Sequence, residues 1–403
     1  MPRIRIQVEQ YPVKWPAQRI SSSSPKSFGM YAKAAKLMQA GVDVIHLEVG
    51  MPGFDTPQHV KDAAIAALQA GKVHYGQFPG ETGLRRAIVN RLKAYNDLTV
   101  KESEVIVTNG LTHASYAVLM AALDPGDEVI LLEPYYPQHI NKIEMAGGKP
   151  VFVPLDKAKG FAIDPAAIEA RITPRTRMIC LVNPANPTGR VFTRAELTAL
   201  ADICIKHDLL VMSDEVYEQI VYDGHKHISI ASLPGMFERT FSMFAFTKAY
   251  AMDGWRIGYV AAHEKFIPAI LKITMNDVSH VNVFIQDGAQ AALEGPQDCI
   301  GEMLAVDKRC RELVVTRMNQ MSGVTCERPQ GTIYAFPDIA ATGKTSQQVA
   351  DEILEQCHVV TEAGTFYGPG GEGHLRICFG AEPYERIELA MDKMARYFAQ
   401  DRT

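Results

Sequence analysis

Four short segments carry side chains that could act together on one small molecule. Each follows an apolar run with the length of a buried strand: Thr108–Thr112, Asn183–Gly189, Ser213–Tyr217 and Thr247–Lys248. The first leads into a helix whose N-terminus could bind an anion, and the others supply an amide, a carboxylate beside a phenol, and an amine. In an open α/β sheet, ligands bind outside the carboxyl ends of the strands. These residue types fit a ligand that carries a phosphate, a basic ring nitrogen and an aldehyde.

Pyridoxal phosphate has all three of these groups. Its aldehyde condenses with a lysine amine, and a carboxylate keeps its ring nitrogen protonated so that the ring accepts electrons. Each segment alone has an ordinary structural explanation: asparagine and glycine in a turn, aspartate as a helix cap, lysine as a solvated charge. The cofactor hypothesis therefore depends on the four segments occurring together at corresponding strand ends.

The elements that would position these segments alternate between strands and helices from residue 105 onward. Helical patterns separate several of the apolar runs, as at Thr193, whose hydroxyl and Glu196 predict a capping box. Because the runs do not alternate between apolar and polar residues, we expect a largely parallel sheet with helices on both faces. The runs lie at 105–107, 129–132, 178–182, 209–212, 240–244 and 257–261.

Both ends of the chain have a different pattern. After residue 290, amphipathic helices at 303–321, 346–356 and 385–398 surround a few strands, which indicates a second, α+β domain. Residues 1–28 are expected to form an extended arm. A helix from Lys26 to Ala40, a strand at 44–49 and a helix capped by Thr56 are expected to follow. We predict three parts: 1–50 (arm and part of the small domain), 51–290 (large cofactor-binding domain) and 291–403 (small C-terminal domain).

Composition excludes several classes of protein. The 403 residues include 41 basic and 46 acidic side chains, and the net charge of −5 argues against nucleic acid or an anionic membrane as partner. No apolar run approaches the ~18–20 residues of a spanning helix, and no secretory signal is evident, so a cytoplasmic location is expected. The seven cysteines are scattered without a Cys-x-x-Cys pair, so neither disulfides nor a metal site is expected.

Three of the segments resemble the class I and II aminotransferases of the aspartate aminotransferase superfamily (fold type I). The matching motifs are NPANPTG at Asn183–Gly189, SDEVY at Ser213–Tyr217 and TKAYAMDGWRIG at Thr247–Gly258. Residues 124–129 and 371–376 add to the match, and the resemblance covers residues 44–380. It implies a large domain with a mostly parallel seven-stranded sheet flanked by helices. It also implies a smaller α+β domain formed by the N-terminal segment and the C-terminal third.

The resemblance also implies a role for each residue around the cofactor ring. Lys248 would form a Schiff base with pyridoxal 5'-phosphate and then carry the proton between the substrate and the cofactor. Asp214 would pair with the ring nitrogen, and Tyr217 and Asn186 would hydrogen-bond the phenolic oxygen of the ring. Tyr136 would stack on the ring. Lys248, Asp214 and Tyr217 are the predicted catalytic residues.

The phosphate and the substrate would be held by other segments. Tyr75 would reach the phosphate of the neighbouring subunit, which implies a homodimer with shared active sites. Arg376 would bind the substrate carboxylate through two hydrogen bonds, near Gly50 and Asn186. Ala245 stands where many relatives carry a phosphate-binding serine, so one hydroxyl contact is expected to be missing. The remaining phosphate ligands implied by the resemblance are Gly110, Leu111, Thr112 and Arg256.

The expected reaction moves an amino group between an α-amino acid and a 2-oxo acid. A β-elimination lyase or a decarboxylase on the same fold would use the same lysine and aspartate. A non-catalytic binding protein is disfavoured because the lysine is intact and no helix-turn-helix is evident.

The donor side chain is expected to be neutral. Dicarboxylate-specific relatives often take a second arginine from the neighbouring subunit, out of the stretch after the lysine motif, but here no arginine lies between Arg256 and Arg309, and His280 or Lys272 would have to supply the charge instead. Thr112 stands where some aspartate-using relatives carry lysine. A second buried carboxylate would then lack a fixed cation, which is costly. A site lined by Tyr334 and Asn282 would suit neutral or aromatic side chains, so such donors should outcompete aspartate.

Overall fold

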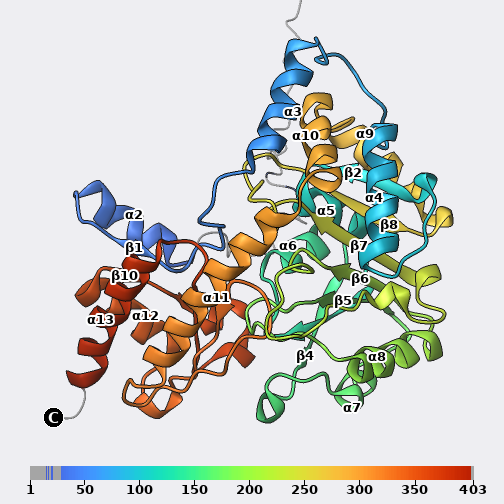
Figure 1. Cartoon of the computed structure of the whole chain (residues 1–403). Helices are drawn as coiled ribbons and strands as arrows, with labels where there is room; N and C mark the ends of the chain where they lie inside the picture. Colours follow the sequence, from blue (N-terminus) through green and yellow to red (C-terminus); the bar gives the residue numbers. More distant parts are fainter. Residues whose placement is uncertain (1–14, 16, 18–19, 21–28, 401–403) are drawn as a thin grey trace, which may run out of the picture.

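The computed structural model describes Trp15, Ala17, Ile20 and residues 29–400 (Figure 1). Most of the expected arm at 1–28, and the expected helix start at Lys26, lie outside these described residues. The first helix of the described chain, α2, spans Tyr31–Gln39. Within the described ranges, no helix is long and apolar enough to cross a bilayer.

The large sheet has seven strands, as expected, and four of its six strand pairs are parallel. Strand β8 is the exception, because it runs antiparallel to both of its neighbours. The parallel strands therefore bring the ends of β5, β6 and β7, which carry three of the four predicted segments, to one edge of the sheet. In spatial order the strands are β2 (Val105–Thr108), β8 (Gly258–Ala262), β7 (Thr240–Ala245), β6 (Leu210–Asp214), β5 (Thr176–Val182), β3 (Glu128–Glu133) and β4 (Lys149–Pro154).

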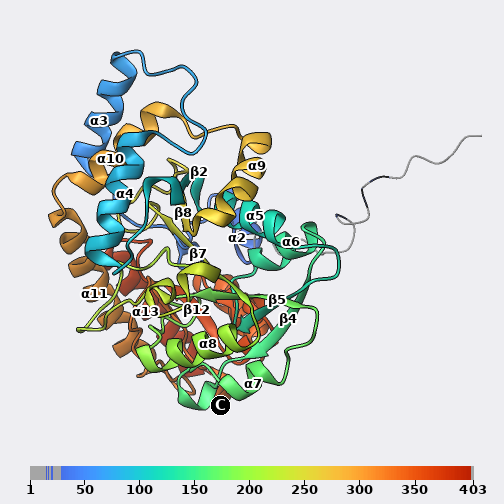
Figure 2. The same ribbon diagram turned by 90° about the vertical axis from the view of Figure 1, so that its right-hand side faces the viewer.

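Helices cover both faces of this sheet, which explains the unbroken apolar strands. In β5, Met178 and Cys180 pack with α5, α6 and α9, whereas Ile179 and Leu181 pack with α8 on the opposite face (Figure 2). One face carries α5 (Gly110–Ala122), α6 (Gln138–Met145) and α9 (Ile267–Asp277). The other carries α4 (Thr82–Tyr95), α7 (Pro165–Glu169), α8 (Arg194–Lys206) and α10 (Val283–Glu294), with α3 (Gln58–Gln69) packed on α10.

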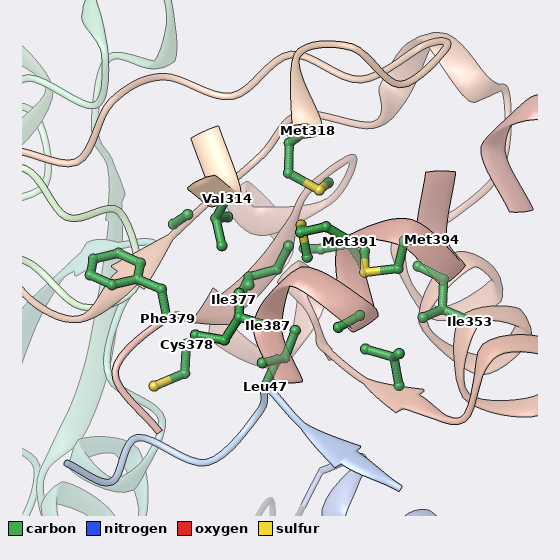
Figure 3. Close-up of a cluster of buried hydrophobic side chains, with 14 of the residues drawn as sticks. Leu47, Val314, Met318, Ile353, Ile377, Cys378, Phe379, Ile387, Met391 and Met394 are labelled. Carbon is green, nitrogen blue, oxygen red and sulfur yellow. The ribbon is translucent and has the colours of Figure 1, made fainter. Parts of the chain in front are cut away.

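The two ends of the chain form the expected smaller α+β domain. β1 (Ile45–His46) pairs in parallel with β10 (Val359–Val360), and β11 (Glu362–Ala363), β12 (Leu375–Cys378) and β9 (Tyr334–Ala335) form a three-stranded antiparallel sheet. Helices α11 (Asp298–Met318), α12 (Ser346–Cys357) and α13 (Tyr384–Gln400) complete the domain. Its core joins Leu47 to Val314, Ile377 and Met391 (Figure 3). The boundaries at residues 50 and 290 remain predictions.

The two predicted helix caps have opposite outcomes. Thr193 and Glu196 form the capping box, because the Thr193 Oγ1 accepts the amide of Glu196 and the Glu196 carboxylate accepts the amide of Thr193 at 2.9 Å. The cap at Thr56 is wrong. Its hydroxyl donates instead to the carbonyl of Ala251 at 2.6 Å, and α3 begins after Pro57 without a side-chain cap. A tertiary hydrogen bond has replaced the local one.

Candidate active site

A cavity of about 610 Å³ is lined by residues of both domains. It brings together residues that the sequence separates by more than 300 positions. Ten of the twelve predicted site residues line it: Gly50, Leu111, Thr112, Tyr136, Asn186, Asp214, Tyr217, Lys248, Arg256 and Arg376. Gly110 does not line the cavity itself but lies beside Arg256, which does. Tyr75 lies outside the cavity.

One end of the cavity is formed by the N-terminus of α5 and by Arg256. The first amides of a helix have no intrahelical acceptor, so they are free to bind an anion. Gly110 begins α5 with φ +75°, and a Cβ built there would lie 2.6 Å from Nη2 of Arg256. Because only a glycine leaves room for the guanidinium, this turn and Arg256 form a cradle suited to phosphate.

Asp214 is the last residue of β6, and its side chain lies in the cavity wall. Its Oδ1 accepts the amide of Val216 at 3.2 Å, and its Oδ2 lies 3.7 Å from Nε2 of His139. Burial lowers the pKa of His139, although the Asp214 carboxylate opposes that shift. The sequence analysis missed His139; the available signal was a histidine three residues after Tyr136, at the start of α6.

Lys142 is a second residue that the sequence analysis missed. It lies in the cavity wall, and its Nζ donates to Ser115 Oγ at 2.7 Å. Burial lowers the pKa of Lys142 to about 8, against the attraction of Asp214. The Ser115 hydroxyl is within 3.0 Å of the Leu111 carbonyl, so Lys142 connects α6 to the first turn of α5. A lysine within the apolar face of α6 was the signal.

Lys248 follows β7, and its partly buried side chain donates through Nζ to the main-chain oxygen of Gly50. Burial lowers the pKa of Lys248 to about 8, because the low-dielectric surroundings disfavour the ammonium ion. The Nζ lies 5.8 Å from the centroid of the Tyr217 ring. A lysine that loses its proton this readily can act as a nucleophile or a base near neutral pH.

Arg376 lies on β12 and lines the cavity. Its Nη1 donates to Asn186 Oδ1 at 3.2 Å, and its Nε has no hydrogen-bond partner among the described residues. The guanidinium carbon lies 4.3 Å from the ring centroid of Tyr334 and 4.9 Å from that of Tyr367. The Tyr334 hydroxyl is in turn 2.7 Å from that of Tyr217. The planar group is thus held in one orientation, as two-point recognition of a carboxylate requires.

Tyr75 does not reach the cavity of its own chain. Its side chain is 95% exposed and lies against the His280 ring in an edge-on arrangement, with 5.7 Å between the ring centroids. The two residues line a separate hollow that also contains Asn282. Asn282 does not line the cavity of its own chain. Its expected place beside Tyr334 and the role of Tyr75, both across a subunit interface, remain predictions.

Comparisons with known proteins agree with this geometry. The sequence model of the family "Aminotransferase class I and II" matches residues 42–393. An aspartate aminotransferase of Pyrococcus abyssi is 40% identical over 88% of this chain and 91% of its own length. An aromatic-amino-acid aminotransferase of Thermococcus litoralis is 37% identical over 90% and 94%. The solved structure of an aspartate aminotransferase from Rhizobium meliloti superposes with a TM-score of 0.91 and 33% identity, over 95% of this chain and 98% of the other.

Proposed function

The chain belongs to the class I and II aminotransferases and is a transaminase, and on that premise we propose that its cavity holds pyridoxal phosphate. The cofactor would serve amino-group transfer from an α-amino acid to a 2-oxo acid. One observation carries this proposal. An anion cradle, a carboxylate, a partly buried lysine and a buried arginine line the same cavity.

These residues fit the cofactor group by group. The Gly110 turn and Arg256 suit its phosphate, Asp214 suits a protonated ring nitrogen, and the Lys248 amine suits its aldehyde. When bound, pyridoxal phosphate supplies an electrophilic carbon and a ring that accepts the electrons of the bond being broken.

The chain's own groups would then orient the substrate and move its proton. Arg376 binds the α-carboxylate through its guanidinium edge, helped by Asn186. Lys248 lies within reach of the Gly50 main chain beside that carboxylate site. Its neutral amine could therefore take the proton from the substrate Cα and return it to the carbon of the cofactor that carried the aldehyde.

The test is the reaction of the holoenzyme with an amino acid alone. One equivalent of enzyme should release one equivalent of 2-oxo acid, retain the amino group on the cofactor and then stop, which absorbance follows directly. Lys248→Ala should hold the cofactor yet give no release. Continuous release of ammonia would indicate an elimination lyase, and continuous release of carbon dioxide a decarboxylase. Either result would contradict the proposal.

We further propose that neutral donors outcompete aspartate in kcat/KM. The names of the two relatives specify different donors, so similarity does not choose between them. Within the cavity, Tyr334, Tyr367 and Phe366 offer aromatic surface, and Thr112 offers no charge. A panel of amino acids in the same assay tests this choice. A tenfold advantage for aspartate would contradict it while leaving the transaminase assignment intact.

A further inference from the structure

Two glutamates that the mechanism does not use lie in the wall of the same cavity. Glu362 on β11 is paired in register with Arg376 on β12. Cross-strand partners point to the same face of a sheet, so the Glu362 carboxylate lies on the side where Arg376 would hold the substrate. Glu48 precedes Gly50 by two residues, and its main-chain oxygen accepts a hydrogen bond from Arg376. Glu48 and Glu362 are 4% and 5% exposed.

Neither carboxylate is paired with a lysine or arginine of the described chain, although the hydrogen bond to Glu48 raises the pKa of His46, so this imidazole offsets part of the Glu48 charge when it is protonated. Glu48 Oε1 accepts from Nδ1 of His46 at 2.8 Å, whereas Oε2 is buried without a hydrogen-bond partner in the described chain. Glu362 Oε2 accepts the amide of Met30 at 3.1 Å, and the Ala363 amide also lowers the pKa of this carboxyl. Among the described residues, no lysine or arginine nitrogen lies within ion-pair distance of either. Unpaired buried carboxylates are costly, and a cation relieves that cost.

The electrostatics of Glu362 agree with a missing cation. Burial is the main cause that raises the pKa of Glu362 to about 7; the charge of Glu48 contributes to this rise, while the Met30 amide and Arg376 oppose it. Tyr367 also interacts with the Glu362 carboxyl. A positive charge placed beside Glu362 would favour its ionised form.

We propose that Glu48 and Glu362 form a subsite for the positively charged end of the donor side chain. The preferred donor is then an α-amino acid whose side chain ends in an ammonium or guanidinium group. Arg376 takes the α-carboxylate, and the two glutamates take the distal cation. This inference rests on the proposed function, and it extends the exclusion of aspartate, because a second carboxylate would meet two like charges.

Binding of unreactive acids to the holoenzyme tests the subsite without turnover. We choose three chains that lack the α-amine: 5-guanidinopentanoate (cationic), hexanoate (neutral) and glutarate (anionic). Titration calorimetry should give roughly tenfold or greater tighter binding of the guanidino acid than of hexanoate, with glutarate weakest. Equal or tighter binding of hexanoate would overturn the proposal, and this comparison needs no variant.

Two variants test whether Glu48 and Glu362 cause the tighter binding of the guanidino acid. Glu48→Gln and Glu362→Gln keep a hydrogen-bond acceptor for His46 and Met30 but remove the charge, so each should lose most of the preference for the guanidino acid. Glu355→Gln, an exposed change on α12, is the matched control and should keep it. If the glutamates only brace β1 and the start of α2, both variants would retain the preference, and the proposal fails.

A pH series and a donor panel complete the test. The preference for the cation should weaken as pH falls through about 7, because Glu362 takes up a proton, and Glu362→Gln should flatten this dependence. In the transamination assay, lysine and arginine should exceed norleucine in kcat/KM. If norleucine is as good, the subsite fails and the transaminase proposal stands. If no amino acid reacts, the proposed function is contradicted. The binding of the unreactive acids then still tests the subsite, because it does not depend on turnover.

Discussion

At the scale of single residues, burial sets the chemistry of the site. A solvent-exposed lysine has a pKa of about 10.4. Burial of Lys248 in the cavity disfavours its ammonium form and lowers its pKa to about 8. His139 is held toward its neutral form by the same effect, beside the Asp214 carboxylate. The cavity thus supplies a base and a fixed negative charge without unusual residue types.

The lowered pKa predicts how the apoenzyme takes up its cofactor. Only the neutral amine attacks an aldehyde, so the capture rate should rise about tenfold per pH unit and level off above pH 8. Stopped-flow absorbance from roughly pH 6 to 10 measures this. Lys142→Met should keep the profile even though Lys142 has a similar pKa, whereas a rate still rising at pH 10 would contradict the assignment.

Asp214→Asn should lower kcat far more than it raises KM. The carboxylate is needed when negative charge spreads into the ring, so the loss should be roughly a hundredfold or more. Steady-state kinetics with one donor separates the two parameters. Asp202→Asn, an exposed change on α8, should alter neither. A large rise in KM at unchanged kcat would assign Asp214 to substrate binding instead.

At the scale of elements, strand ends and helix starts present these groups. β6 ends at Asp214, β7 ends just before the lysine segment, and α5 starts at Gly110. At each junction the chain leaves the sheet or enters a helix, so the adjacent side chains can face the cavity at the carboxyl ends of the strands rather than the core.

Gly110→Ala should weaken cofactor binding by about tenfold or more, because its Cβ would displace Arg256 from the α5 N-terminus. Gly126→Ala is the matched control, since Gly126 also has positive φ (+94°) but has open space around its Cβ. Both changes should cost ~1–2 kcal/mol in free energy of unfolding from the left-handed backbone. Only Gly110→Ala should raise the cofactor Kd, measured by equilibrium titration. Equal affinities would contradict the cradle.

At the scale of the whole molecule, one surface remains uncovered. Ile65 and Leu68 on α3 are 49% and 45% exposed, and Val73, Tyr75 and Phe78 follow at 60%, 95% and 46%. Large apolar side chains gathered on one segment are typical of a protein interface. This exposure supports the predicted homodimer, in which Tyr75 would serve the partner's site.

Hybrid dimers test that arrangement. When Tyr75→Phe and Lys248→Ala subunits are mixed, Tyr75 acting in trans should leave one site intact and place both defects in the other. The purified hybrid should then retain about half the specific activity of the unmutated dimer. If Tyr75 acts within its own chain, every site carries one defect, and no fully active site is found. Analytical ultracentrifugation confirms that the species assayed is a dimer.

The sequence by itself determined the family and the residues at the strand ends of the large sheet. Its apolar runs predicted six of the seven strands, and the seventh, β4, was expected only from the resemblance to the family. The residues at the strand ends could be predicted because strand, turn and helix start are contiguous, so a short motif such as Ser213–Tyr217 contains both the turn and the functional groups. The capping box at Thr193 is local in the same way. Thr56 shows the limit: its hydroxyl bonds to Ala251, almost 200 residues away.

Only the tertiary structure decided which distant side chains share the cavity. The register of β11 against β12 sets Glu362 opposite Arg376, and the β1–β10 pairing carries the segment with Glu48 to the same place. His139 meets Asp214 because α6 packs on the face of the sheet beside β6. No sequence spacing encodes these contacts. They follow from the pairing register of the strands and from the packing of helices on the sheet. Both depend on all parts of the core together rather than on a local stretch of sequence.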